Sequence, residues 1–133
     1  MSQEDCIFCK IIKKEIPSDI ILETDLSLAF TDINPLSQGH VLVIPKEHAE
    51  KMHENSDEAL SDILSVIKQI VKASPVEEYN ILQNNGRIAH QLVMHTHFHM
   101  IPKPSKDRGL VLSWSPKGDA DQKSFADSVR KNL

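Results

Sequence analysis

The octapeptide His95–Pro102, HTHFHMIP, carries the most informative pattern in the chain. Three histidines alternate with Thr96 and Phe98, and the run continues into the apolar Met100 and Ile101. Because a β-strand sends alternate side chains to the same face, the pattern predicts a strand with three imidazoles along one side. The apolar continuation argues against three solvated surface histidines, so we interpret this strand as part of a functional site.

Three adjacent imidazoles are compatible with two kinds of catalysis. Histidine is the commonest metal ligand, and His-x-His on a strand can supply two ligands to a catalytic metal. Alternatively, the central imidazole is a nucleophile toward phosphorus, because imidazole is largely neutral near pH 7 and its phosphorus adduct can be hydrolysed. The spacing of the histidines does not separate these two interpretations.

Polar residues elsewhere favour a phosphate ligand. The turn formed by Asn84–Gly86 and Ala89–Gln91 can offer backbone N–H groups to an anion. Asp32 follows the apolar Phe30, and at a strand end its carboxylate could hold ribose hydroxyls. The other interpretation of Asp32 is an Asx turn with Asn34 and no ligand at all.

The rest of the sequence predicts an α+β fold in which a mostly antiparallel sheet carries helices on one face. A long helix is predicted after a capping box of Asn55 and Glu58, since apolar residues then follow helical spacing. The periodic positions are Leu60, Ile63, Leu64, Ile67, Ile70 and Val71. Short helices are predicted over 6–15 and near Phe125, and strands over 20–23, 27–31, 40–45, 79–83 and 95–102.

Composition indicates one ordinary globular domain, with 133 residues, 40% hydrophobic residues and a net charge of -4. The lysines and arginines are dispersed, and their densest cluster, at positions 10, 13 and 14, is too short for a duplex nucleic-acid footprint. The polar N-terminus lacks the apolar stretch of a signal peptide, and no run could span a membrane. We therefore expect a cytoplasmic protein, with the nucleus as a second compatible location.

Cys6 and Cys9 form a Cys-x-x-Cys pair with three interpretations. A redox pair normally follows a strand in a βαβ unit, and nothing before Cys6 predicts one. The pair could instead be half of a structural zinc site that needs two further ligands. The remaining interpretation is two reduced thiols packed beside Phe8.

The blocks around these residues resemble the histidine triad (HIT) family. Its His-x-His-x-His signature followed by apolar residues is HTHFHMI at 95–101. Further family-like blocks, in the same order, are CIFCKII at 6–12, AFTDINP at 29–35, GHVLVIPKEH at 39–48 and LQNNGRIAHQ at 82–91. The resemblance covers residues 6–102 and is looser over 103–133, where only Trp114 is similar.

The resemblance is strongest to the Hint branch of purine nucleoside phosphoramidases, especially its fungal-type members. It implies a single domain over 1–133, with a core of about 6–102 and a C-terminal extension. The implied fold is a five-stranded, mostly antiparallel sheet with one long helix and short terminal helices, and two sheets joined edge to edge in a homodimer. The implied activity is hydrolysis of adenosine 5'-monophosphoramidate and AMP-amine conjugates. Alternatives are a dinucleoside polyphosphate hydrolase of the same family and a non-catalytic nucleotide-binding or scaffold protein.

The resemblance also implies roles for individual residues. His97 is expected to become AMP-histidine, with His99 and His40 assisting at the phosphate and no cofactor required for the chemistry. Zinc-bearing family members imply a structural zinc site at Cys6, Cys9, His48 and His95. The implied nucleotide contacts are Ile7, Phe8, Phe30, Asp32, Ile33, Asn84, His90, Gln91, Leu92, His97 and His99.

Two positions depart from the family pattern. Leu92 stands where many Hint proteins have a serine that is thought to handle the leaving amine. His90 replaces the usual glycine whose backbone N–H meets the phosphate, and we expect that backbone donor to survive the change. The family pattern therefore does not predict which leaving groups this protein prefers.

Overall fold

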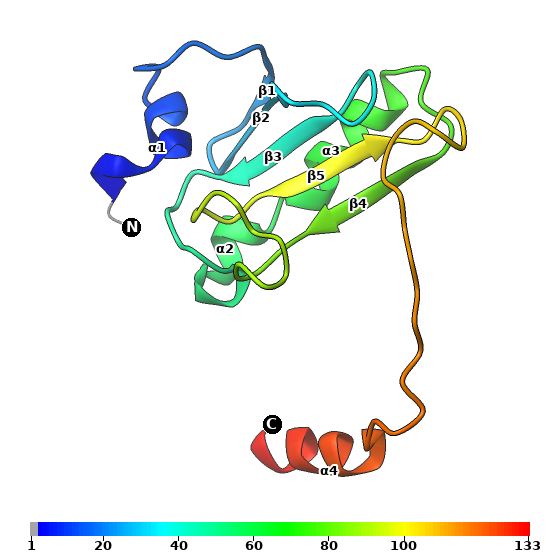
Figure 1. The fold of residues 1–133 in the computed structure, drawn as a ribbon. Helices are drawn as coiled ribbons and strands as arrows, with labels where there is room; N and C mark the ends of the chain where they lie inside the picture. Colours follow the sequence, from blue (N-terminus) through cyan, green and yellow to red (C-terminus); the bar gives the residue numbers. More distant parts are fainter. Residues whose placement is uncertain (1–2) are drawn as a thin grey trace.

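A five-stranded antiparallel sheet in the order β1-β2-β3-β5-β4 forms the centre of the computed structural model, which describes residues 3–133 (Figure 1). The strands are β1 (Ile20–Glu23), β2 (Ser27–Thr31), β3 (Val41–Pro45), β4 (Tyr79–Gln83) and β5 (Phe98–Pro102). The predicted ranges of β1, β2 and β4 are confirmed. β3 begins one residue later than predicted and β5 three residues later.

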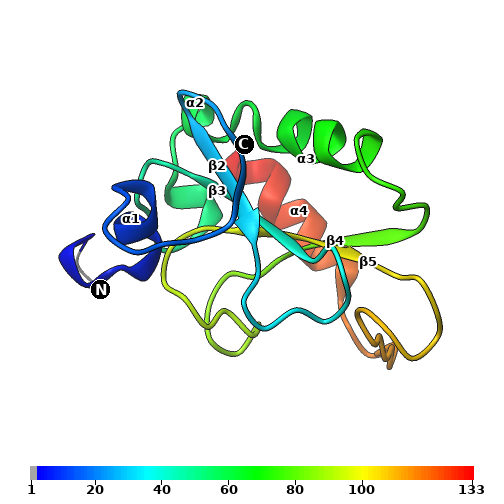
Figure 2. The same cartoon turned by 90° about the horizontal axis from the view of Figure 1, so that it is seen from above.

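Helices cover both faces of the sheet, so the prediction that they share one face is wrong. On one face, Phe8 and Ile11 of α1 (Ile7–Ile12) pack in a cluster with side chains of β2 and β3: Leu28, Phe30, Leu42 and Ile44. On the other face, α3 (Ile63–Lys72) packs against Ala29, Val41, Val43 and Met100 (Figure 2). The reason is that β2 and β3 are apolar at consecutive positions, so both of their faces need a cover.

The predicted long helix is divided in two. The first part, α2 (Asp57–Leu60), is capped by Ser56, whose Oγ accepts the Ala59 N–H at 3.1 Å. The predicted cap Asn55 is wrong, because its side-chain amide instead donates to Glu47 Oε1 at 2.9 Å. A 3-10 turn over Met52–Glu54 precedes α2.

The division falls where α3 is fastened to the first hairpin. Asp62 accepts hydrogen bonds from the hydroxyls of Thr24, at 2.7 Å, and Ser27. These contacts hold the start of α3 over the β1–β2 turn and end α2 two residues earlier. The predicted apolar position Leu64 faces outward, because the buried face of α3 is formed by Ile63, Val66, Ile67 and Ile70, and Leu64 is 61% exposed.

One half of the α1 face of the sheet has no helix over it. The register partners of His99 on β5 are Leu42 of β3, which belongs to the α1 cluster, and Leu82 of β4, which lies in the uncovered half. Register partners point to the same side of a sheet, so His99 faces the side that α1 covers only over β2 and β3. This geometry leaves room for a pocket beside α1.

The C-terminal segment leaves the sheet after β5. Residues 105–109 form a turn beside the sheet, and the chain then runs as an extended arm to α4 (Gln122–Asn132), which lies apart from the sheet (Figure 1). Asp121 caps this helix by accepting the Ser124 N–H at 3.0 Å, and the predicted helix near Phe125 is confirmed. A further 3-10 turn spans Gln3–Asp5. Every helix within residues 3–133 is too short or too polar to cross a bilayer.

Candidate active site

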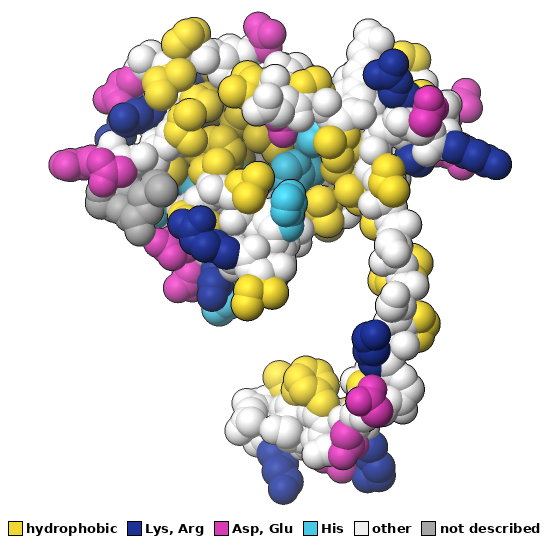
Figure 3. Space-filling view, viewed as in Figure 1, with side chains coloured by type: hydrophobic (Ala, Val, Ile, Leu, Met, Phe, Trp, Pro, Cys, Tyr) yellow, Lys and Arg dark blue, Asp and Glu magenta, His cyan; other side chains and the backbone are white. Residues whose placement is uncertain are grey.

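A cavity of about 530 Å³ opens on the half-covered face between α1, the end of β2 and the loop that precedes β5. Apolar side chains surround histidines on this side of the molecule (Figure 3). The sequence-predicted residues that line it are Ile7, Phe8, Phe30, Asp32, Ile33, His40, Asn84, His90, Leu92, His97 and His99. All predicted nucleotide contacts except Gln91 therefore meet at one pocket.

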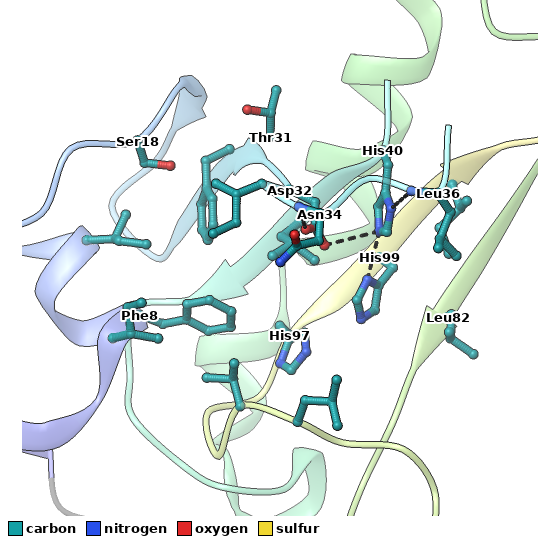
Figure 4. Close-up of a pocket in the computed structure, with 18 of the residues that line it drawn as sticks. Phe8, Ser18, Thr31, Asp32, Asn34, Leu36, His40, Leu82, His97 and His99 are labelled. Atoms are coloured by element: carbon teal, nitrogen blue, oxygen red, sulfur yellow. Dashed lines mark hydrogen bonds and ion pairs between the residues drawn. The ribbon is translucent and has the colours of Figure 1, made fainter. Parts of the chain in front are cut away.

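The sheet topology brings Asp32, His40 and His99 together (Figure 4). Because β2 and β3 are antiparallel neighbours, the end of β2 and the start of β3 lie side by side, and Asp32 N–H donates to the His40 carbonyl at 3.1 Å. His40 and His99 are 59 positions apart in the sequence, yet His40 Nε2 lies 2.9 Å from His99 Nδ1. Residues from three strands or strand ends thus form one polar cluster.

Hydrogen bonds place the protons of His40 and His99. The Leu36 backbone N–H donates to His40 Nδ1 at 3.0 Å, so the proton of the neutral His40 ring is on Nε2. That Nε2–H donates to His99 Nδ1, which leaves His99 with its own proton on Nε2. The pair therefore presents an N–H donor of His99 for a ligand.

The same bonds decide against a catalytic metal at this cluster. Ligand atoms of Asp32, His40 and His99 lie within 4.8 Å of one another, which is close enough to hold an ion. A metal would need a lone pair on His40 Nε2, but this nitrogen carries the proton because Nδ1 accepts from Leu36. Of the two kinds of catalysis open at the histidines, the geometry favours the nucleophile.

His97 is oriented as a nucleophile. Its Nδ1–H donates to the His95 carbonyl at 2.6 Å, so the lone pair of the neutral ring is on Nε2. Within residues 3–133, no hydrogen bond occupies that Nε2. The ring is held edge-on between Phe8 and His99, with centroid distances of 5.1 and 5.0 Å. A fixed ring with an unprotonated nitrogen in the pocket can attack an electrophile.

The three histidines of the motif do not share one face, contrary to the prediction from a strand over 95–102. β5 begins at Phe98, so His95 and His97 lie in the irregular segment before it. The His95 Nε2–H donates to the Pro45 carbonyl at 2.8 Å, which turns Nδ1 toward Cys6 and away from the pocket. His97 and His99 alone of the three line the cavity.

Burial keeps the pocket imidazoles neutral. It lowers the pKa of His99 to about 4, an effect to which positive charge on His97 and His40 would add. Burial also lowers the pKa of His97 and His40, and the Asp32 carboxylate opposes this effect at both rings. The rings of His40, His97 and His99 are therefore uncharged at neutral pH.

The Asx-turn interpretation of Asp32 is confirmed for one of its carboxylate oxygens, and the other oxygen lies near His40. Its Oδ1 accepts the Asn34 N–H at 2.8 Å, which is the Asx turn. Its Oδ2 lies 3.5 Å from His40 Nε2, and the side chain lines the pocket. The Asx turn therefore fixes the carboxylate at the cavity wall and does not remove it from the site.

The turn after β4 differs from its prediction in two respects. Gln91 is fully buried and does not line the pocket, because its Oε1 accepts the Gly86 N–H at 2.7 Å and its Nε2 donates to the Val93 carbonyl at 3.0 Å. The His90 N–H is not a free donor, because it donates to the Arg87 carbonyl at 2.9 Å. Gln91 is a brace for the loop, and the expected backbone donor of His90 is already used.

Several lining residues were missed by the sequence analysis. Ile101 continues the alternation of His97 and His99, so the strand period could have identified it. Leu82 and Leu110 have no such signal, because they reach the pocket through strand register and through the C-terminal arm. The other missed lining residues are Ile11, Ile16, Pro17, Ser18, Thr31, Asn34, Leu36, Leu42 and Val93.

A second cluster, behind the pocket, joins the four residues Cys6, Cys9, His48 and His95. His95 Nδ1 lies 3.4 Å from Cys6 Sγ, 3.6 Å from Cys9 Sγ and 3.2 Å from His48 Nδ1, and Cys9 Sγ lies 3.3 Å from His48 Nδ1. Burial, with the Cys6 thiol beside it, raises the pKa of Cys9 to about 11. The cluster offers two sulfur and two nitrogen donors to one point.

Known proteins resemble the chain over most of its length. Residues 13–106 match the HIT domain model. An adenosine 5'-monophosphoramidase of Schizosaccharomyces pombe is 62% identical over 82% of each chain, and one of Saccharomyces cerevisiae is 53% identical over 82% of this chain and 69% of its own. A solved structure of a histidine triad nucleotide-binding protein from Candida albicans aligns with a TM-score of 0.89 at 45% identity, over 97% of each chain.

Proposed function

The chain belongs to the HIT family, and we propose that it hydrolyses the P–N bond of adenosine 5'-monophosphoramidate and of AMP linked to amines. The observation that carries this proposal is the His97 ring, whose proton is held on Nδ1 by the His95 carbonyl. A lone pair on Nε2 is thereby available in a cavity large enough for a nucleotide. The fungal relatives named adenosine 5'-monophosphoramidase supply the substrate class.

The reaction is a double displacement. The His97 Nε2 lone pair attacks the α-phosphorus, the P–N bond breaks, and its electron pair leaves with the amine nitrogen, which takes up a proton. Water then attacks the phosphorus of AMP-histidine, and the products are AMP and the free His97 ring. Catalysis by positioning and by stabilisation of charge is sufficient for both steps.

The His40–His99 pair assists at the phosphate. The Leu36 N–H fixes His40, and His40 in turn fixes His99 with an N–H on Nε2. A donor that is oriented before the reaction costs no reorganisation when negative charge develops on a phosphate oxygen. Loss of His40 should therefore weaken catalysis through the orientation of His99.

The nucleoside fits the end of the pocket near α1. Ile7, Phe8, Phe30 and Ile33 form an apolar wall for the base, and Asp32 offers a carboxylate oxygen to the ribose hydroxyls. Nucleotide sites commonly combine an apolar surround with a few fixed polar groups. We therefore expect the base on the α1 side of the pocket and the phosphorus next to His97.

The proposal is tested by comparing substrates. Turnover of adenosine 5'-monophosphoramidate is measured beside turnover of diadenosine polyphosphates, for wild type and His97→Ala. We expect phosphoramidate turnover that disappears in the variant. A preference for polyphosphates would make the protein a dinucleoside polyphosphate hydrolase, and AMP binding without turnover of either substrate would make it a nucleotide-binding protein.

We further propose a structural zinc ion at the cluster of Cys6, Cys9, His48 and His95. Tetrahedral zinc, with bonds of about 2.3 Å to sulfur and about 2.0 Å to nitrogen, needs ligand atoms roughly 3.3–3.8 Å apart. The four separations measured from His95 and Cys9 lie between 3.2 and 3.6 Å. The Pro45 carbonyl holds the His95 proton on Nε2, which keeps Nδ1 free as a ligand. The ion would supply a cross-link between α1 and the sheet.

We also propose a homodimer in which two sheets join at β4. β4 is an edge strand with β5 as its one neighbour in the described sheet. Its apolar side chains Tyr79 and Ile81 are 41% and 46% exposed. An exposed edge with apolar side chains is a template for pairing with a second strand. Edge-to-edge association would cover both the backbone groups and these side chains.

A further inference from the structure

His90 occupies an unfavourable backbone conformation at the pocket. Its φ of +70° is in the left-handed region, where glycine is favoured and other residues are strained. Within residues 3–133, the one other non-glycine residue there is Lys14, which does not line the cavity. A histidine at this position is therefore less stable than a glycine would be. This strain suggests that the imidazole side chain has a function.

The backbone of His90 is already committed to the loop. Its N–H donates to the Arg87 carbonyl at 2.9 Å, and its carbonyl accepts from Asn84 Nδ2 at 3.2 Å. The next residue, Gln91, is anchored by its buried side chain on both sides. What His90 can offer to a ligand is consequently its side chain, which stands at the pocket wall on a fixed loop.

The loop of His90 lines the part of the pocket that the nucleotide leaves vacant. The base wall comes from α1, β2 and Ile33, and the phosphorus lies next to His97 in the centre. The remaining lining comes from the loop between β4 and β5, with His90 and Leu92, and from the apolar side chains of Leu36, Leu82, Ile101 and Leu110. The leaving group is the third part of the substrate, after the nucleoside and the phosphate, and the loop is the part of this remaining lining that offers a polar side chain to it. Leu92 is 70% exposed there, so the wall is open to leaving groups of different sizes.

The side chains of this wall differ in which of them can interact with a charged leaving group. None of the lining residues within 3–133 is lysine or arginine, and Leu92 has no polar group. His90 is thus the one side chain on this wall that can carry a positive charge. A negatively charged group beside the scissile nitrogen would therefore bind to the His90 side chain.

We propose that the His90 side chain contacts the leaving group and makes the enzyme prefer AMP conjugates of amines with a carboxylate near the nitrogen. The imidazole donates a hydrogen bond to that carboxylate, and the bond is charge-assisted on the carboxylate side. The proposal rests on the proposed phosphoramidase function and names the substrate class within it. His90 is then a specificity residue at a position where glycine would be the less strained choice.

Two isosteric substrates provide the test, namely AMP joined through nitrogen to glycine and to glycinamide. The two differ in a carboxylate against a neutral amide, so the ratio of their kcat/KM values isolates the contact. We expect wild type to prefer the glycine conjugate and His90→Gly to reduce this ratio on the order of tenfold. His90→Asn keeps a donor and tolerates the left-handed backbone, so it should give an intermediate ratio.

The controls separate selectivity from folding and from activity. Glycine relieves the backbone strain, so His90→Gly should melt no lower than wild type. Ile88→Ala changes a fully exposed residue of the same loop that does not line the pocket, and it should leave the ratio as in wild type. An equal ratio in wild type and His90→Gly, with both conjugates hydrolysed, would overturn the role of His90 and leave the proposed function standing. Failure of wild type to hydrolyse any AMP-amine, the simple phosphoramidate included, would overturn both.

Discussion

In the pocket, neighbouring polar groups determine which nitrogen of each imidazole carries the proton. The His95 carbonyl holds the proton of His97 on Nδ1, and the Leu36 N–H, through His40, holds that of His99 on Nε2. One ring thus presents a lone pair and its neighbour a donor. Attack on phosphorus requires both, and this division of roles is fixed before a substrate arrives.

Burial of these rings predicts how stability depends on pH. The pKa of His99 is about 4 in the folded protein and 6.5 ordinarily, so the unfolded chain binds this proton more tightly. The free energy of unfolding should therefore fall as the pH drops from 6.5 toward 4. His40 and His97, whose pKa values are also lowered, act in the same direction.

Urea unfolding at pH 7 and pH 5 measures this loss for wild type and for His99→Asn. The variant lacks the titrating ring, so its stability should depend less on pH. Carboxylates stay ionised over most of this range and contribute little to the difference. Equal losses in the two proteins would show that His99 is not the group responsible.

At the scale of elements, apolar runs were sufficient to predict most of the sheet. The strands over 20–23, 27–31 and 79–83 have the predicted bounds because short β-prone runs lie between turn residues. The division between α2 and α3 could not be predicted, because it depends on hydrogen bonds from Thr24 and Ser27 to Asp62, far apart in the sequence. Local periodicity contains no information about such contacts.

The cap of α2 gives a prediction at the same scale. Ser56 Oγ accepts the Ala59 N–H, so Ser56→Ala should lower the free energy of unfolding by about 1 kcal/mol. Ser61→Ala is the matched control, because its exposed hydroxyl donates to the Glu58 carbonyl and caps no N–H group. Chemical denaturation of both variants measures the difference, and equal stabilities would argue against the cap.

At the scale of the whole molecule, the Cys and His cluster connects segments that are distant in the sequence. Cys6 and Cys9 belong to the α1 region, His48 follows β3, and His95 precedes β5. α1 also carries Phe8, which packs against His97. A metal ion at this cluster would therefore support the pocket indirectly, by holding α1 against the sheet.

Removal of the proposed zinc ion should lower the stability of the protein without abolishing turnover. We expect a chelator to lower the melting temperature by several degrees, while turnover at moderate temperature continues, because the ion lies outside the reaction. Cys9→Ser should lower the melting temperature similarly and make it insensitive to the chelator. Loss of turnover in a protein that stays folded would instead indicate a catalytic metal.

The oligomeric state tests the exposed edge of the sheet. Light scattering should give the mass of a dimer for wild type and of a monomer for Ile81→Glu, since a charge at the edge strand opposes pairing. Ile88→Glu places the same charge on an exposed residue of the loop after β4 and should remain dimeric. A monomeric wild type would contradict the proposed assembly.

Most residues predicted to lie at the pocket do line it, but the orientation and the hydrogen bonds of individual groups could not be predicted from the sequence. Of the eleven nucleotide contacts predicted from the histidine motif and its neighbouring blocks, ten line the pocket, with Gln91 as the exception. The direction of His95 depends on the Pro45 carbonyl, 50 positions away. The use of the His90 N–H depends on a turn geometry that residue types do not specify. The first feature depends on a long-range hydrogen bond and the second on a local turn bond to Arg87.

The most direct measurement is covalent labelling by substrate. The enzyme is mixed with adenosine 5'-monophosphoramidate carrying labelled phosphorus and quenched in alkali, where a phosphorus–histidine bond survives, and the label is located by peptide mapping. We expect one AMP on His97 in wild type, no label in His97→Ala, and the same labelling after treatment with a chelator. Label on another residue, or turnover by His97→Ala, would contradict the assignment of His97 as the nucleophile.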